Sequence, residues 1–354
     1  RSDVPIAFCL SGGVDSSLLA SHAKKTFDKE ISTFSIIDKD PRYDEYENIK
    51  HIIDDLKCKH ELIKIDNSEN IFFDRLRMLT KYHDGPIATL SYYVHSFLSE
   101  NISKNGYRVA ISGTGADELF TGYYDHFLLH FEALKGTKYL NSNIESWTKF
   151  ILPKIRNPYL QNSKLYIEDP ENRDLVYEKN LGVSQYSINT FDQKFTEENY
   201  CDELLRKRMM NELFHEVVPV ILKHDDLNSM YYSIENRSPY LDRDLLEFTL
   251  TIPPHLLIAN GLQKKILRDS GDGILNDQVR LSKQKKGFNA SINSIINFDN
   301  SNVIDLIFDT SSPIAEYVDL VKLKKDLNYE LIPNHLSKLI FSIISTNFFL
   351  ESNK

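Results

Sequence analysis

Short apolar runs alternate with amphipathic stretches over the first 130 residues of the chain. Residues 6–10, 32–36, 61–65 and 108–111 are runs of strand length that are rich in β-forming side chains. Residues 16–27, 44–56, 71–82 and 91–101 lie between or beside them and have helical character. Strands that alternate with helices in this way predict an α/β fold, with a mostly parallel sheet covered by helices on both faces.

The pattern changes after about residue 130, where strand signals become sparse. Residues 201–214, 245–251 and 336–348 carry apolar side chains at helical spacing, so this part should be mainly helical. Residues 139–194 are rich in Asn, Ser and aromatic side chains with weak periodicity, which predicts an irregular insertion or lid. We therefore expect one domain over 1–354, with an α/β core over 1–130 and a mainly helical part over 131–354.

A glycine-rich segment follows the first predicted strand directly. Residues 11–17 have the sequence SGGVDSS, and the next helix should begin near Asp15 or Ser16. Glycine and small hydroxyl residues let backbone N–H groups approach a phosphate, and the helix N-terminus adds positive potential. The usual ATPase loop ends in Gly-Lys-Ser/Thr, which is absent here, and Asp15 needs a cation such as Mg²⁺ beside phosphate oxygens. The segment therefore predicts a pyrophosphate and magnesium site, with an ordinary strand-to-helix turn as the alternative.

A second glycine-rich segment follows the strand predicted at 108–111. Residues 112–118 have the sequence SGTGADE and end in Asp117 and Glu118. Two acids at the start of a helix can simply stabilise the helix dipole. Ligands of parallel sheets, however, bind outside the carboxyl ends of the strands, where both segments should lie. We therefore expect the two segments to face one nucleotide.

The composition and net charge of the chain indicate which kinds of molecule it can bind. The 354 residues are 41% hydrophobic, and 42 Lys+Arg stand against 51 Asp+Glu for a net charge of −9. This balance disfavours nucleic acid as a partner, and no apolar stretch reaches the length of a membrane span. No signal peptide is recognisable, and three scattered cysteines support neither a disulfide framework nor a zinc site. We expect a cytoplasmic protein with a small-molecule substrate.

Five motifs occur in an order that resembles one known family. They are SGGVDSS at 11–17, SGTGADELFTGY at 112–123, ENRSPYLD at 235–242, KKILR at 264–268 and KKGF at 285–288. Together they resemble the synthetase domain of glutamine-dependent asparagine synthetase, over about residues 1–288. The resemblance implies a Rossmann-like parallel sheet of the adenine nucleotide alpha-hydrolase (PP-loop) type. It also implies an ATP-dependent, AMP-forming amide ligase that adenylates a carboxylate and lets ammonia displace AMP.

The resemblance further implies roles for single residues. Lys264 would meet the phosphates and stabilise the adenylation transition state, although a solvated helical lysine is the alternative. Asp15 and Asp117 would coordinate Mg²⁺, and Thr114 completes the candidate catalytic group. Lys283, Lys285 and Lys286 contact either phosphate or solvent. The residues expected to bind the nucleotide are Leu10, Ser11, Gly12, Gly13, Asp15, Ser16, Ser17, Ile36, Ser112, Gly113 and Glu118.

Thr114 is a departure from the family pattern. The asparagine-forming members resemble Ser-Gly-Glu-Gly-Ala-Asp-Glu at this segment, with the glutamate on the acceptor side as ammonia attacks. Threonine can neither act as a general base at neutral pH nor bind an amino group by charge. The acceptor is therefore aspartate or another carboxylate, such as a surface-sugar uronate, a peptide or a β-lactam precursor. Residues 86–91 are expected to contribute to its pocket.

A second departure concerns the source of ammonia. Full-length members of the family begin with a cysteine that hydrolyses glutamine, whereas this chain begins with Arg1 and Cys9 lies within a predicted strand. We therefore expect a glutaminase domain upstream of Arg1, or a separate subunit, and a homodimer is compatible with the sequence. Two other classes stay open: a PP-loop tRNA-modifying enzyme, disfavoured by the net charge and the scattered cysteines, and a non-catalytic nucleotide-binding scaffold.

Overall fold

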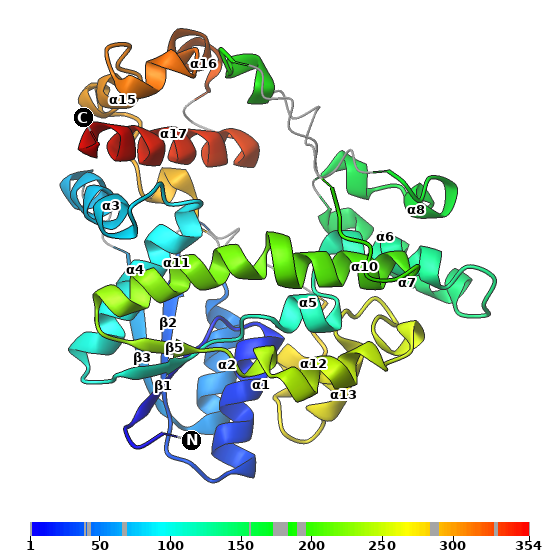
Figure 1. Ribbon diagram of the computed structural model, residues 1–354. Helices are drawn as coiled ribbons and strands as arrows, with labels where there is room; N and C mark the ends of the chain where they lie inside the picture. Colours follow the sequence, from blue (N-terminus) through cyan, green and yellow to red (C-terminus); the bar gives the residue numbers. More distant parts are fainter. Residues whose placement is uncertain are drawn as a thin grey trace.

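Five parallel strands form the single sheet of the described structure (Figure 1), in the order β3-β2-β1-β4-β5. The computed structural model describes residues 2–38, 40, 44–65, 69–155, 157–172, 183–189, 196–283, 290–328 and 332–353. The strands are β1 (Ile6–Cys9), β2 (Ser32–Ile37), β3 (Lys59–Lys64), β4 (Val109–Ile111) and β5 (Glu235–Arg237). The first four confirm the sequence prediction. The sequence did not predict β5, because its three residues are polar and it lies at the sheet edge.

Four helices connect these strands much as expected. They are α1 (Val14–Ser21), α2 (Tyr46–Leu56), α3 (Glu69–His83) and α4 (Leu90–Lys104). Helix α1 continues without a break as a π-helical turn, η1 (His22–Thr26). Helix α2 buries Ile49, Ile52 and Leu56, which lie on one face at a spacing of three and four residues.

The sheet is apolar on both faces, as parallel sheets usually are. Ala7 and Phe8 are neighbours in β1 and so point to opposite faces. Ala7 packs with Phe34 and with side chains of α3, α4 and the last helix, α17 (Asn334–Ser352). Phe8 packs instead with α1, α2 and the helices that follow β4. The prediction of an α/β fold with helices on both faces is therefore confirmed.

The part of the chain beyond β4 is mainly helical, as predicted. Helix α11 (Val218–Tyr231) runs from the sheet toward the other helices of this part (Figure 1). No helix among the described residues is both long and apolar enough to cross a membrane. Among the described residues, the other α-helices are α5 (Ala116–Phe120), α6 (Tyr124–Ala133), α7 (Leu140–Phe150), α8 (Leu165–Glu168), α10 (Leu204–Asn211), α12 (Arg243–Leu250), α13 (Lys265–Ser270), α14 (Asp277–Arg280), α15 (Ser301–Ile307) and α16 (Leu320–Asp326).

The segment predicted as an irregular insertion is partly helical. Residues 140–150 form α7, which packs Ile144 and the fully buried Trp147 into the same core as Phe8. These side chains are three residues apart, a short apolar stripe that the polar composition of the segment obscured. Residues 156, 173–182 and 190–194 of this segment lie outside the described residues.

The strand order positions the site. Strands β2 and β3 follow on one side of β1, whereas β4 pairs with β1 on its other side. The order therefore reverses between β1 and β4, and ligands of open parallel sheets bind outside the carboxyl ends of the strands at such a point. The two glycine-rich segments follow β1 and β4 directly.

Candidate active site

A cleft lies at the carboxyl ends of β1, β2 and β4. Its walls include both glycine-rich loops, one face of α4, part of α11 and the segment around α13. The sequence-predicted residues that line it are Leu10, Ser11, Gly12, Gly13, Asp15, Ser16, Ile36, Ser112, Gly113, Thr114, Asp117 and Lys264. Residues from four separate segments of the sequence therefore meet in one place.

Two predicted residues do not line the cleft. Ser17 is fully buried within α1, and Glu118 is buried behind Asp117. Both follow a cleft residue in the sequence, but the helical turn directs their side chains away from it. Their positions do not support the expected contact with a nucleotide.

The first loop is held by its own serines. The Ser11 N–H donates to Ser16 Oγ at 3.1 Å, and the two hydroxyl groups lie 3.0 Å apart. The Gly13 N–H donates to Ser11 Oγ at 3.3 Å. Gly12 has φ +77°, a left-handed conformation that glycine adopts without steric cost. The loop is thus pre-shaped at the N-terminus of α1, where an anion is favoured.

The two glycine-rich loops contact each other. A Cβ atom at Gly113 would lie 3.0 Å from the backbone nitrogen of Ser16 and 3.1 Å from Asp15 Cβ. Only glycine allows this close approach without a shift of either loop. Tyr240 adds a link, because its hydroxyl donates to the carbonyl oxygen of Asp15 at 3.1 Å.

Lys264 joins the acids of the two loops. Its Nζ lies 2.5 Å from Asp15 Oδ2 and 2.5 Å from Asp117 Oδ1. The side chain is only 7% exposed, and its backbone is left-handed at φ +55° at the start of α13. Burial favours the neutral amine, but the nearby carboxylates of Asp117 and Asp15 outweigh it and raise the pKa of Lys264. One ammonium therefore neutralises part of the charge of two carboxylates.

The remaining oxygen of Asp15 is suited to a cation. Asp15 Oδ1 is buried and has no hydrogen-bond partner among the described residues. Asp117 lies across the same ammonium, so the two carboxylates converge on one part of the cleft. Hard oxygen donors beside a phosphate-binding loop are the ligands that Mg²⁺ prefers, so the donor set fits this ion.

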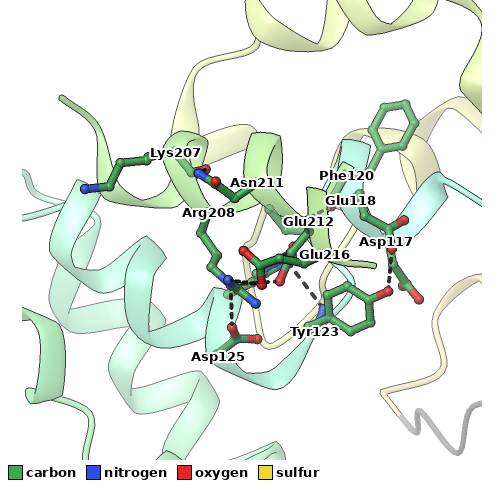
Figure 2. A network of polar contacts seen from close by, with 12 residues as sticks. Asp117, Glu118, Phe120, Tyr123, Asp125, Lys207, Arg208, Asn211, Glu212 and Glu216 are labelled. Carbon is green, nitrogen blue, oxygen red and sulfur yellow. Dashed lines mark hydrogen bonds and ion pairs between the residues drawn. The ribbon is translucent and has the colours of Figure 1, made fainter. Parts of the chain in front are cut away.

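Glu118 connects the cleft to a buried polar network. The Tyr123 hydroxyl donates a hydrogen bond to Glu118 Oε1 at 2.5 Å (Figure 2). Burial, followed by the charge of Asp117, raises the pKa of Glu118 to about 7. The Tyr123 N–H donates to Nδ1 of His126, whose Nε2 lies 2.8 Å from Glu212 Oε2. The network therefore runs from the second loop through α6 to η5 (Glu212–Glu216).

Arg208 neutralises the far end of this network. Its guanidinium lies 3.1 Å from Glu212, 2.6 Å from Glu216, 3.3 Å from Glu197 and 3.7 Å from Asp125. Figure 2 shows the carboxylates of Asp125, Glu212 and Glu216 around it. Asp125, His126 and Glu212 are also spaced closely enough to share a metal ion. Because His126 Nδ1 accepts the Tyr123 N–H, Nε2 carries the ring proton toward Glu212, which argues for a structural network instead.

Sequence reasoning missed several residues of the cleft. His95, Leu98, Ser99 and Ile102 line it from one face of α4, at helical spacing that a sequence also shows for ordinary core residues. Asp225 and Ser229 of α11, Asn48 of α2 and Arg268 of α13 also line it. Arg268 was within a quoted motif, but no role was assigned to it.

Two other predictions concerned residues 86–91, as part of the acceptor pocket, and the lysines at 283, 285 and 286. Residues 86–91 are not part of the cleft lining, and the Ile87 N–H donates instead to Ser345 Oγ of α17 at 2.7 Å. Lys283 lies with its Nζ 3.3 Å from the centroid of the Phe150 ring. Residues 285–288, with Lys285 and Lys286, lie outside the described residues.

The strand order of the parallel sheet reverses between β1 and β4, and the two glycine-rich loops lie at this point, with Lys264 between their acids. These features define a nucleotide-binding α/β domain of the PP-loop type. The family model for asparagine synthase matches residues 1–340, and the chain belongs to that family.

Several curated proteins are similar to the chain. It is 28% identical over 303 residues to asparagine synthetase [glutamine-hydrolyzing] 1 of Bacillus subtilis, covering 81% of this chain and 46% of the relative. Asparagine synthetase [glutamine-hydrolyzing] 3 of the same organism is 25% identical over 303 residues, with coverages of 80% and 45%. Amidase chry2 of Gibberella zeae is 23% identical over 339 residues, with coverages of 79% and 48%. The chain thus spans about half the length of the curated relatives it matches.

Proposed function

We propose that the chain carries out the synthetase reaction of an ATP-dependent, AMP-forming amidotransferase of the asparagine synthase type. A carboxylate attacks the α-phosphorus of ATP and pyrophosphate leaves, and ammonia then attacks the acyl-adenylate so that AMP leaves and an amide forms. The observation that carries this proposal is the contact of Lys264 with Asp15 and Asp117, between two glycine-rich loops. Membership of the asparagine synthase family supports it.

The cleft residues divide into two groups. Backbone N–H groups and hydroxyls of residues 11–16, at the N-terminus of α1, would bind the leaving pyrophosphate. Leu10, Ile36 and Gly113 would contact the adenosine part, because they line the cleft at the ends of β1, β2 and β4. Lys264 would stabilise the charge that spreads over the phosphate oxygens in the transition state. Its ion pairs with the two acids position the ammonium before substrate binds.

Asp15 and Asp117 would hold Mg²⁺, and this assignment is supported by Asp15 Oδ1, which has no hydrogen-bond partner in the part of the chain that the structure describes. The ion, when bound, supplies positive charge that stabilises the departing pyrophosphate.

The acceptor is a small-molecule carboxylate, either aspartate or another acid. Thr114 lines the cleft and receives a hydrogen bond from Ser112 Oγ at 3.3 Å, so the second loop offers no carboxylate at this position. The relatives include proteins named asparagine synthetase and proteins named amidase, which is compatible with more than one acceptor. Surface-sugar uronates, peptides and β-lactam precursors therefore stay as alternatives.

A glutaminase domain or subunit would supply the ammonia. The names of the two B. subtilis relatives include glutamine hydrolysis, and about half of each of these proteins lies outside the match. A cytoplasmic location and a homodimer stay predictions.

Product analysis tests the proposal directly. The protein is incubated with ATP, MgCl₂ and NH₄Cl, with L-aspartate or with one member of a carboxylate panel, and pyrophosphate, AMP and amide are measured. We expect the three products in equal amounts with the true acceptor. Release of ADP and phosphate in place of AMP and pyrophosphate would contradict the proposal, and so would no turnover with any carboxylate.

A further inference from the structure

His95 and Asp225 form a pair on the wall of the cleft. His95 is on α4 and Asp225 is on α11, two helices that pack side by side near the sheet (Figure 1). His95 Nδ1 lies 2.8 Å from Asp225 Oδ1. The Asp225 carboxylate accepts a hydrogen bond from Nδ1–H, so Nε2 is the nitrogen that carries the lone pair in the neutral ring. The pair therefore has the geometry in which an acid orients a histidine for proton transfer.

The surroundings hold this geometry in place. Asp225 is buried, with a side chain only 9% exposed, whereas the His95 side chain is 26% exposed. The ring of Tyr92 lies edge-on to His95 at 6.1 Å between centroids and stacks on His224 at 4.5 Å. Burial, followed by the charge of Asp225, raises the pKa of Cys9 to about 12, so the nearby thiol stays protonated.

The cleft needs a proton acceptor that the second loop does not provide. The nitrogen that attacks an acyl-adenylate must lose a proton, and Thr114 cannot take it at neutral pH. Asp15 and Asp117 are engaged by Lys264. Among the described residues that line the cleft, His95 is the only histidine.

We propose that His95 is the general base of the amide-forming step and that Asp225 is its positioning residue. This inference rests on the proposed function and names a residue for its second half. As the new C–N bond forms, a proton of the attacking ammonia passes to His95 Nε2. The C–O bond to the adenylate then breaks, AMP leaves with the electron pair, and His95 returns the proton to water. The first half, adenylation, does not use this proton transfer.

The test separates the two halves of the reaction. ATP–pyrophosphate exchange measures adenylation alone, whereas amide formation from NH₄Cl measures both halves of the reaction. L-Aspartate is the first acceptor tested, followed by the carboxylate panel. For His95→Gln we expect exchange within about twofold of the parent protein and amide formation about 100-fold slower, the usual size of general-base catalysis. Asp225→Asn should lose at least about tenfold in amide formation, because the Asn side chain no longer fixes the tautomer. His51→Gln, on the exposed face of α2, is the matched control and should leave both rates unchanged.

A second nucleophile distinguishes a base from a structural pair. Hydroxylamine is a weaker base than ammonia and is largely unprotonated at neutral pH, so it needs less help from a general base. The defect of His95→Gln should therefore shrink at least about tenfold when hydroxylamine replaces ammonium.

Each contrary outcome has a distinct meaning. Unchanged amide formation in His95→Gln would overturn this inference while leaving the proposed function intact, and so would loss of exchange or an equal defect with both nucleophiles. Absence of exchange in the parent protein with every carboxylate would instead overturn the proposed function, and this inference with it.

Discussion

The ammonium of Lys264 lies 2.5 Å from a carboxylate oxygen of Asp15, although the two residues are 249 positions apart in the sequence. The same ammonium lies 2.5 Å from Asp117. Asp15 is in the first turn of α1, Asp117 is in the first turn of α5, and Lys264 lies at the start of α13. The Lys264 ammonium, which would contact the ATP phosphates in the proposed reaction, therefore also links distant parts of the fold.

Replacement of Lys264 should affect both stability and activity. Lys264→Met leaves two carboxylates facing each other without a cation, which should cost about 1–3 kcal/mol of unfolding free energy, less than for a fully buried pair because both acids are partly exposed. Pyrophosphate formation should fall by at least about 100-fold. Lys265→Met is the control, because Lys265 pairs with Asp269 at the surface and its loss should cost about 1 kcal/mol or less. Equal effects of the two substitutions, in urea unfolding and in pyrophosphate assays, would contradict this account.

Gly113→Ala should disturb the contact between the loops. The added methyl group would lie 3.0 Å from the Ser16 nitrogen, so the loops must separate by a few tenths of an ångström. We expect a loss of about 1–3 kcal/mol in stability, typical of overpacking, and weaker ATP binding measured by calorimetry. Gly85→Ala is a suitable control, since the nearest atom to its methyl group would be 3.8 Å away. Normal ATP affinity in Gly113→Ala would argue against the close packing of the loops.

Glu118 should make stability depend on pH. Burial raises its pKa in the folded protein to about 7, above its ordinary value of 4.5, so the folded state binds the proton more tightly. Its contribution to stability is therefore fully present below pH 4.5 and is lost as the pH rises toward 7. As the pH rises from 4.5 to 7.5, the unfolding free energy of Glu118→Gln should increase by about 2–3 kcal/mol relative to that of the parent protein. Denaturant unfolding of both proteins across this range measures the difference, and a constant difference would refute the pKa shift.

Replacement of Arg208 should lower the unfolding free energy of the protein, because this residue neutralises the acids beside the active site. Arg208→Met would leave Glu212 and its neighbouring carboxylates buried without their counter-ion, at a cost of about 3–5 kcal/mol. Arg243→Met is the control, because Arg243 pairs with Glu247 at an exposed helix surface and should contribute less than about 1 kcal/mol. Similar melting temperatures for the two variants would show that the network around Arg208 adds little.

The features that sequence predicted are those encoded locally. A buried strand that ends in SGGVDSS specifies its loop and its helix within a few residues, so β1, the first loop and α1 could be placed directly. The second loop followed from the same pattern after β4. Lys264 gained its role only from the family resemblance, because the residues that pair with it are far away in the sequence.

Other features depend on how helices pack, which local patterns do not report. His95 and Asp225 meet because α4 and α11 lie together, and each residue alone resembles an ordinary polar position on a helix. The acids around Arg208 come from α6, η5 and the chain before α10 in the same way. The strand β5 escaped prediction because three polar residues carry no hydrophobic signal.

The most direct measurement is carboxylate-dependent release of pyrophosphate from ATP by the parent protein and by Asp15→Asn, as a function of MgCl₂. We expect release by the parent that requires Mg²⁺. In Asp15→Asn, release should fall at least about 100-fold, because the substitution removes a carboxylate beside the phosphate-binding loop. Asp54→Asn, on the exposed face of α2, should behave as the parent. Equal release by Asp15→Asn at every Mg²⁺ concentration would contradict the assignment of this cleft as the ATP site.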